Sequence, residues 1–171
     1  MSKEPEQEFS RVREENANGP PEGFGKGVNE YLSHYVRNAD AKAGVLVAAN
    51  LTIGAFLLAH QPTGFCASIV HWLAIGLLVL SALFGGLVVY PRTPSSGDGL
   101  IFWEDILSRR GPEQYQEELK GLDQKKVEGE YAIQNYYVSQ VLRKKHNWIR
   151  WCLRCFFVAV ACAALSIGIS S

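Results

Sequence analysis

The chain has 171 residues, a length that suits one domain, and its 17 basic and 17 acidic residues cancel to a formal net charge of zero. Zero net charge argues against a protein that binds a nucleic-acid polymer through a strong basic field. Mean hydropathy is −0.02, yet the 49 residues 43–91 and the 17 residues 155–171 contain no Asp, Glu, Lys or Arg. A soluble domain distributes charge over its whole surface, so this pattern excludes a compact soluble enzyme.

The N-terminal part changes from a polar tail to a helical pattern. Residues 1–25 have few apolar residues and several Gly and Pro, which is typical of a disordered tail. From about Gly27, apolar residues recur at spacings of three and four, which predicts one continuous helix from about Val28 to about His60. We expect 26–42 to be a cytoplasmic helix and 43–60 to be the first membrane span.

Three segments are apolar enough to cross a bilayer, whose hydrocarbon core needs roughly 20 apolar residues in a helix. They are 43–60, 69–90 and 148–169, and a turn at 61–68 joins the first two. The rival for the first segment is a signal peptide, but 42 mostly polar residues precede it, so we expect a retained anchor.

The middle segment 91–147 is predicted to be cytoplasmic and helical. A loop at 91–99 precedes a short amphipathic helix, Leu100–Arg109, and Pro112 begins a second one that ends at Gly121. Asp123 can cap the last helix, which would span about 69 Å if it is unbroken from Gln124 to Ile169. About half of that helix would protrude beside the first one. The expected fold is therefore all-α, with three membrane spans and a helical cytoplasmic stalk.

Basic residues predict the orientation. Segment 1–42 carries 6 Lys or Arg and segment 92–154 carries 11, whereas the loop 60–68 carries none. The positive-inside rule then places the N-terminus and the middle segment in the cytoplasm, and the 61–68 turn and the C-terminus in the periplasm of a bacterial inner membrane.

Catalytic signatures are missing from the sequence. It has no P-loop, zinc-protease, nucleophile-elbow or dinucleotide motif, so we expect no enzyme. Cys152 and Cys155 form a C-x-x-C pair that could bind a metal or act in redox chemistry, but no second pair accompanies them. Packing at a helix interface is the favoured reading, and we expect no metal and no cofactor.

Two polar features fall at or inside the first span. Asp40 and Lys42 lie within a turn of the bilayer, either as a helix-end pair packed against the last helix or as a ligand or gating site. Asn50 lies deeper, where its amide would hydrogen-bond a neighbouring helix or line a pore.

Two further features lie in the middle segment. Trp103, within Phe102-Trp103-Glu104-Asp105, would dock against the membrane interface or the stalk, or would stack on a planar base. Lys144 belongs to a juxtamembrane basic run with Arg143, Lys145, Arg150 and Arg154. Such a run contacts anionic lipid headgroups or the phosphate of a soluble ligand.

These motifs together resemble a family. The run from Ala39 to Gly44 followed by Asn50, Tyr90-Pro91-Arg92 at the end of the second span, the Phe102–Ile106 segment, Tyr115, and the approach from Lys144 to Trp148 are similar to the transmembrane effectors of Pycsar, the pyrimidine cyclase system for antiphage resistance. The resemblance covers about Val28 to Ile169.

The resemblance implies a function and partners. A partner pyrimidine cyclase would sense phage and make cyclic CMP or cyclic UMP, and the effector would then impair the inner membrane and cause abortive infection. The cytoplasmic stalk offers candidate ligand-binding residues. Three thin helices with one Asn are too little to enclose a wide pore within one protomer, so we expect a homo-oligomer. The alternative is a non-enzymatic membrane adaptor or regulatory subunit of another complex. The candidates are Arg37, Asp40, Lys42, Arg92, Trp103, Asp105 and Lys144 for the nucleotide and Asn50 for a gate or interhelical contact.

Overall fold

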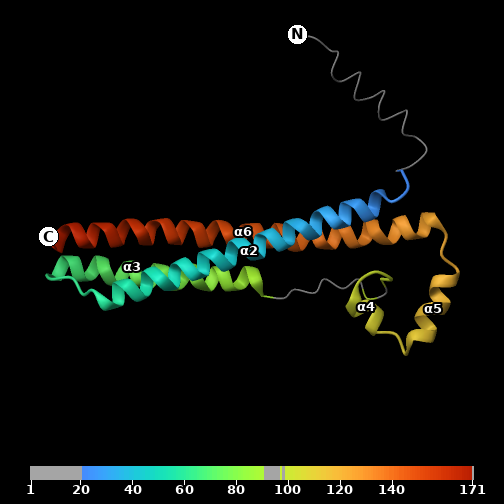
Figure 1. The fold of residues 1–171 in the computed structure, drawn as a ribbon, viewed down its shortest axis with the longest axis horizontal. Coiled ribbons are helices and arrows are strands. Elements are labelled where there is room, and N and C mark those ends of the chain that lie inside the picture. Colours follow the sequence, from blue (N-terminus) through green and yellow to red (C-terminus); the bar gives the residue numbers. More distant parts are fainter. Residues whose placement is uncertain (1–20, 91–96, 98, 171) are drawn as a thin grey trace, which may run out of the picture.

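A computed structural model describes residues 21–90, 97 and 99–170. Residues 1–20, most of the predicted 91–99 loop and the candidate Arg92 lie outside the described residues. Within the described part there are five helices and no strand, which confirms the all-α prediction (Figure 1). The helices are α2 (Phe24–Ala59), α3 (Phe65–Val89), α4 (Trp103–Leu107), α5 (Pro112–Lys120) and α6 (Gln124–Ser170).

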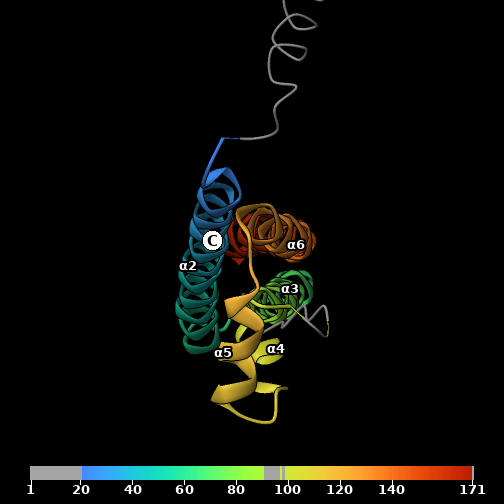
Figure 2. The same ribbon diagram turned by 90° about the vertical axis from the view of Figure 1, so that its right-hand side faces the viewer.

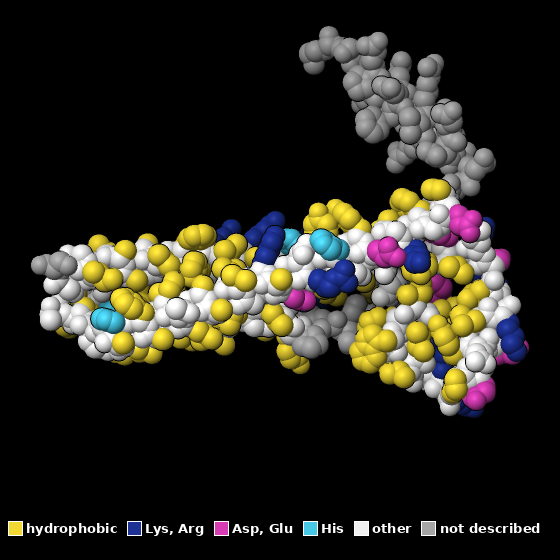
Figure 3. All heavy atoms as spheres, viewed as in Figure 1, with side chains coloured by type: hydrophobic (Ala, Val, Ile, Leu, Met, Phe, Trp, Pro, Cys, Tyr) yellow, Lys and Arg dark blue, Asp and Glu magenta, His cyan; other side chains and the backbone are white. Residues whose placement is uncertain are grey.

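Helices α2, α3 and α6 pack into one bundle, in which α2 and α6 run in the same direction and α3 runs against them (Figures 1 and 2). Each of the three is long and apolar enough to cross a membrane, as the sequence predicts. Leucine, valine and phenylalanine side chains cover much of the outer surface of the bundle (Figure 3). Lipid is the solvent that such a surface fits.

Helices α2 and α6 continue past the end of α3 and pack against each other there. We call this part, residues 24–38 of α2 and 124–144 of α6, the stalk (Figure 1). The Glu128 carboxylate accepts hydrogen bonds from the backbone N–H groups of Gly23 and Gly25, both at 2.9 Å, so α6 caps the start of α2. Asn29 Nδ2 also donates to Asn135 Oδ1 at 3.0 Å. Asp123, the predicted cap of α6, accepts a hydrogen bond from the Lys126 N–H at 2.8 Å.

A heptad repeat explains why the three helices form a bundle. The buried residues of α3 are alternately four and three positions apart, and those of α6 follow the same repeat. A 3.5-residue period keeps one seam of each helix facing its neighbours. We call these inward positions of α2, α3 and α6 the seam. Its buried members are Ala39, Ala43, Asn50 and Leu57 of α2, Ala67, His71, Ala74, Leu78, Ser81, Gly85 and Val88 of α3, and Lys145, Ile149, Cys152, Ala159, Ala163 and Ser166 of α6.

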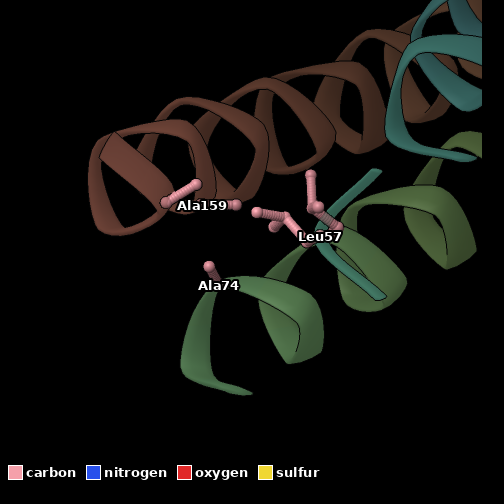
Figure 4. Close-up of a cluster of buried hydrophobic side chains, with 5 residues drawn as sticks. Leu57, Ala74 and Ala159 are labelled. Carbon is pink, nitrogen blue, oxygen red and sulfur yellow. The ribbon is translucent and has the colours of Figure 1, made fainter. Parts of the chain in front are cut away.

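The apolar part of the seam forms two separate clusters. One, which we call the dry layer, contains Leu57, Ala74, Leu78, Ala159 and Ala163. Figure 4 shows Leu57, Ala74 and Ala159 converging from the three helices. The other lies nearer the stalk and contains Ala39, Ala43, Val88 and Ile149. Small residues let the backbones come close: a Cβ at Gly85 would lie 2.6 Å from Val47 Cγ2.

Helices α4 and α5 form a hairpin beside the stalk (Figures 1 and 2). The guanidinium of Arg109 lies 2.6 Å from the Glu118 carboxylate, and this hydrogen bond holds the pKa of Glu118 below its ordinary value. Its stabilising effect is therefore present above the ordinary carboxyl pKa and is lost as the pH falls through the lowered one. The Leu100 N–H donates to Glu130 of α6 at 2.8 Å and so fastens the hairpin to the stalk.

The first helix of the hairpin is shorter than the sequence predicts. The expected range was Leu100–Arg109, but α4 begins at Trp103. The Leu100 carbonyl accepts a hydrogen bond from the Tyr115 hydroxyl at 2.8 Å, and Phe102 is extended with φ −80° and ψ 130°. These contacts hold residues 100–102 outside the helix. The apolar pattern of the sequence does not predict such contacts.

Candidate functional site

The bundle meets the stalk at a buried charged residue, Lys145 of α6. Its side-chain ammonium donates to the carboxylate of Asp40 on α2 and, at 2.6 Å, to the backbone carbonyl of Val88 at the end of α3. The Lys145 side chain is 5% exposed and that of Asp40 is 35% exposed. One side chain therefore joins all three helices at the place where α3 ends.

The surroundings of Lys145 make this contact sensitive to change. The neighbouring seam residues Ala39, Ala43, Val88 and Ile149 are apolar, so an unpaired ammonium there would have no other charged partner among them. Desolvation of a charged pair costs free energy that good geometry only partly returns, and removal of one partner strands the other charge. A movement of α2 against α6 would break the Asp40–Lys145 contact and expose this position.

A groove on α6 is lined by residues that precede and follow Lys145 in the chain, on a face turned away from the Lys145 side chain. It has a volume of about 910 Å³ and carries three cations, Arg143, Lys144 and Arg150, with the ring of Tyr136 at one end. Arginine and lysine bind phosphate, and an aromatic ring can stack on a flat base. We call this the α6 groove. The described residues that line it are Tyr136, Ser139, Gln140, Arg143, Lys144, His146, Asn147 and Arg150.

The structure places the predicted ligand residues at separate positions. Lys144 lines the α6 groove, whereas Arg37 and Lys42 are exposed on α2. Trp103 is 56% exposed and belongs to α4. Asp105 is buried in the hairpin, where its carboxylate accepts a hydrogen bond from the Gly97 N–H at 3.3 Å. Among the predicted ligand residues that the structure describes, Asp40 is paired with Lys145, and Asp105 is buried in the hairpin. The remaining described candidates face outward.

Asn50, the predicted gate or interhelical contact, lies in the seam of α2 and is 2% exposed. Its amide nitrogen donates to the Leu46 carbonyl of its own helix at 2.7 Å. Its Oδ1 is buried with no hydrogen-bond partner in the described part of the chain. Asn50 also lines an apolar groove of about 480 Å³ between α2 and α3.

Sequence reasoning did not single out four further polar residues of the seam. These are Lys145, whose role was hidden in a basic run, and His71, Ser81 and Ser166 in the spans. Ser81 Oγ donates to the Cys152 carbonyl at 2.8 Å and ties α3 to α6. The signal that could have found them is a polar residue at a position where the four-and-three spacing requires an apolar one.

The fold and this site define a class: a helical membrane protein with a charged contact where the bundle meets its stalk. The comparisons with known proteins identify a family within this class. The model of a family described as the Pycsar effector protein domain matches residues 26–170, so the chain belongs to the Pycsar effector family. Pycsar effectors act in antiphage defence, downstream of the cyclase.

A relative supports the same assignment. The chain is 29% identical over 123 residues to a Staphylococcus aureus protein named Pycsar effector protein SaPycTM. The aligned part covers 70% of this chain and 77% of the relative. No solved structure matches the chain. The predicted resemblance is confirmed, and with it the assignment to antiviral defence.

Proposed function

We propose that cyclic CMP or cyclic UMP from a partner pyrimidine cyclase switches this protein into a state that impairs the bacterial inner membrane. The observation that carries the proposal is a cationic groove on α6, the same helix whose Lys145 holds α2 and α3, with Lys144 of the groove next to Lys145 in the chain. The family gives the expected signal, since its members act downstream of a pyrimidine cyclase.

The ligand's chemistry fits this groove. A cyclic pyrimidine mononucleotide has one negative phosphate and one flat base. Arg143, Lys144 and Arg150 offer charge-assisted hydrogen bonds to the phosphate, and the ring of Tyr136 offers a surface for the base. Micromolar affinity corresponds to about 8 kcal/mol, which such contacts can supply.

The groove can act on the bundle because Lys144 and Lys145 are consecutive residues of one helix. A ligand shifts a conformational equilibrium only by its preference for one state. We therefore propose that phosphate binding at Arg143 and Lys144 favours a position of α6 in which Lys145 leaves Asp40 and Val88. Loss of this contact frees α2 and α3 from α6 at the stalk end of the bundle.

The test uses the full chain reconstituted in liposomes that carry an imposed potassium diffusion potential. Cyclic CMP, cyclic UMP and, as a purine control, cyclic AMP are added in turn, and the membrane potential and the heat of binding are measured. We expect one pyrimidine nucleotide to bind and to collapse the potential, and the double variant Arg143→Ala/Lys144→Ala to need at least about tenfold more of it, corresponding to 1.4 kcal/mol.

The matched control is Lys125→Ala, which removes an exposed lysine at the far end of the stalk. No binding and no loss of potential with either pyrimidine nucleotide would overturn the proposal. Co-purification of another protein complex in that case would favour the adaptor function. A double variant that responds like the wild type would show that the nucleotide does not bind in the α6 groove.

A further inference from the structure

The seam of the bundle alternates polar and apolar layers from the stalk to the opposite end. Asp40 and Lys145 form the first polar layer, and the cluster around Ala43 and Ile149 follows it. Next come Asn50, Ser81 and Cys152, then the dry layer, and finally His71 and Ser166. A bundle held by packing alone has no need for polar side chains at its centre, since lipid-embedded helices associate through small residues and close contact.

Three of these polar side chains have an atom without a partner. His71 is 1% exposed and its Nε2 has no hydrogen-bond partner in the described part of the chain. Ser166 is 0% exposed and its Oγ is likewise without a partner, and the same holds for Asn50 Oδ1. A buried polar atom without a partner costs free energy, and an ionisable residue inside a membrane span marks an ion or proton path by default.

The His71 layer opens into a cavity at the end of the bundle opposite the stalk. The cavity has a volume of about 250 Å³, and its polar lining comes from His60, Gln61, His71, Ser166 and Ser170. The rest of the lining is apolar and includes Leu57 of the dry layer. The volume is sufficient for several water molecules, and the polar side chains offer them hydrogen bonds. His60 is the other titratable residue that lines it. Water in this cavity would reach His71 from the outer surface of the membrane.

The dry layer separates His71 and Ser166 from Asn50 and Ser81. Along α3, His71 and Ser81 are ten positions apart, which is about 15 Å of helix. The side chains that fill this interval in the seam are Leu57, Ala74, Leu78, Ala159 and Ala163 (Figure 4). None of them can hydrogen-bond water, so the layer blocks the passage of water and protons in the present state.

We propose that the membrane-impairing state hydrates the dry layer and lets protons cross along the seam of a single chain, with His71 as the carrier. This inference rests on the proposed function and assigns its route. In the hydrated state the His71 Nε2 accepts a proton from water on the outer side, and after the ring turns the imidazolium releases that same proton to water on the Asn50 and Ser81 side. One proton moves from one water molecule to the other, and the ring returns to its starting neutral form. Small Ala and Ser side chains in the seam hold the helices close together, so a path between them admits a chain of water molecules and not larger solutes.

The experiment measures proton flux into liposomes that contain the full chain, an internal pH-sensitive dye and an imposed pH gradient. Leu57→Asn places an amide in the dry layer and is expected to raise the flux at least about tenfold without any nucleotide. Leu165→Asn makes the same change on the lipid-facing side of α6, where Leu165 is 56% exposed, and should leave the flux at the wild-type level. Ala159→Ser is a smaller polar change in the dry layer that should act in the same direction.

Two outcomes would overturn the inference. One is a nucleotide-free flux that is equal in wild type, Leu57→Asn, Ala159→Ser and Leu165→Asn, with helix content and elution volume unchanged. The other is a His71→Gln variant whose nucleotide-evoked proton flux equals that of wild type. Loss of potential by the wild type without any proton flux would refute the proton route and keep the proposed function. Leakage of a large internal dye together with protons would point to a wider pore between chains and would also overturn it.

Discussion

Lys145 shows how one residue can join all three helices of the bundle. It occupies a heptad position that favours an apolar side chain, and yet its ammonium is buried and satisfied by Asp40 and the Val88 carbonyl. The two partners differ in exposure, because the Asp40 carboxylate reaches water and the Lys145 ammonium does not. This difference in exposure predicts that substituting Asp40 and substituting Lys145 lower the stability of the bundle by different amounts.

We predict that Asp40→Ala lowers the stability of the bundle more than Lys145→Met does. Removing Asp40 strands a buried ammonium, which costs about 3–5 kcal/mol, whereas removing Lys145 leaves a carboxylate that water can solvate. The double variant should recover most of the loss, because neither charge is then left buried. The measurement is the midpoint of thermal unfolding in detergent, with the adjacent exposed Lys144→Met as control. Equal and additive shifts would show that the contact does not couple the helices.

The stalk is continuous with the bundle, because α2 and α6 run through both. Its two helices come close together at Gly25, where a Cβ would lie 2.7 Å from both Tyr131 Cβ and Glu128 Oε2. Two residues further on, Gly27 has nothing within 4 Å of the same position. The chain thus offers a pair of glycines in one helix that differ only in the helix packed against them.

We predict that Gly25→Ala separates the ends of α2 and α6 and that Gly27→Ala does not. The added methyl group at position 25 collides with the Tyr131 Cβ and weakens the Glu128 hydrogen bonds, while at position 27 it only improves helix propensity by about 1 kcal/mol. Amide hydrogen exchange should become faster over 24–32 and 124–135 in the first variant and slower or unchanged over 24–32 in the second. Equal protection in both would mean that the stalk helices are not held together at Gly25.

Element boundaries show what the sequence can and cannot predict. The three spans follow from charge-free apolar runs, and the start of α6 follows from Asp123, because these signals are local. The start of α4 does not, because Glu130 and Tyr115 hold Leu100 by contacts between distant segments. The same reason hides the candidate site: Asp40 and Lys145 are 105 positions apart, and only the packing of α2 against α6 brings them together.

Charged side chains gather on the stalk, the hairpin and the adjoining part of the bundle, whereas the opposite end of the bundle shows none on the face drawn in Figure 3. This asymmetry fits a membrane protein. The stalk and the α4–α5 hairpin contain most of the charged residues that the structure describes, and the 61–64 turn and Ser170 lie together at the other end (Figure 1). Arg154 lies 4.8 Å from the centre of the Trp151 ring, a pairing typical of the membrane interface.

We predict that the stalk end is cytoplasmic and that both the turn and the C-terminus are periplasmic. The reason is the positive-inside rule, because the loop 60–68 has no Lys or Arg while segments 1–42 and 92–154 carry 17 between them. Alkaline phosphatase, which is active only in the periplasm, should be active when fused after Ser68 or Ser171 and inactive when fused after Gly121. Phosphatase activity in the Ser68 fusion without activity in the Ser171 fusion would show that α6 does not cross the membrane. In that case α6 could not line the proposed proton route along the seam. Activity in the Gly121 fusion alone would show that the orientation is the reverse of the predicted one. The α6 groove would then lie in the periplasm, where a nucleotide made in the cytoplasm could not reach it.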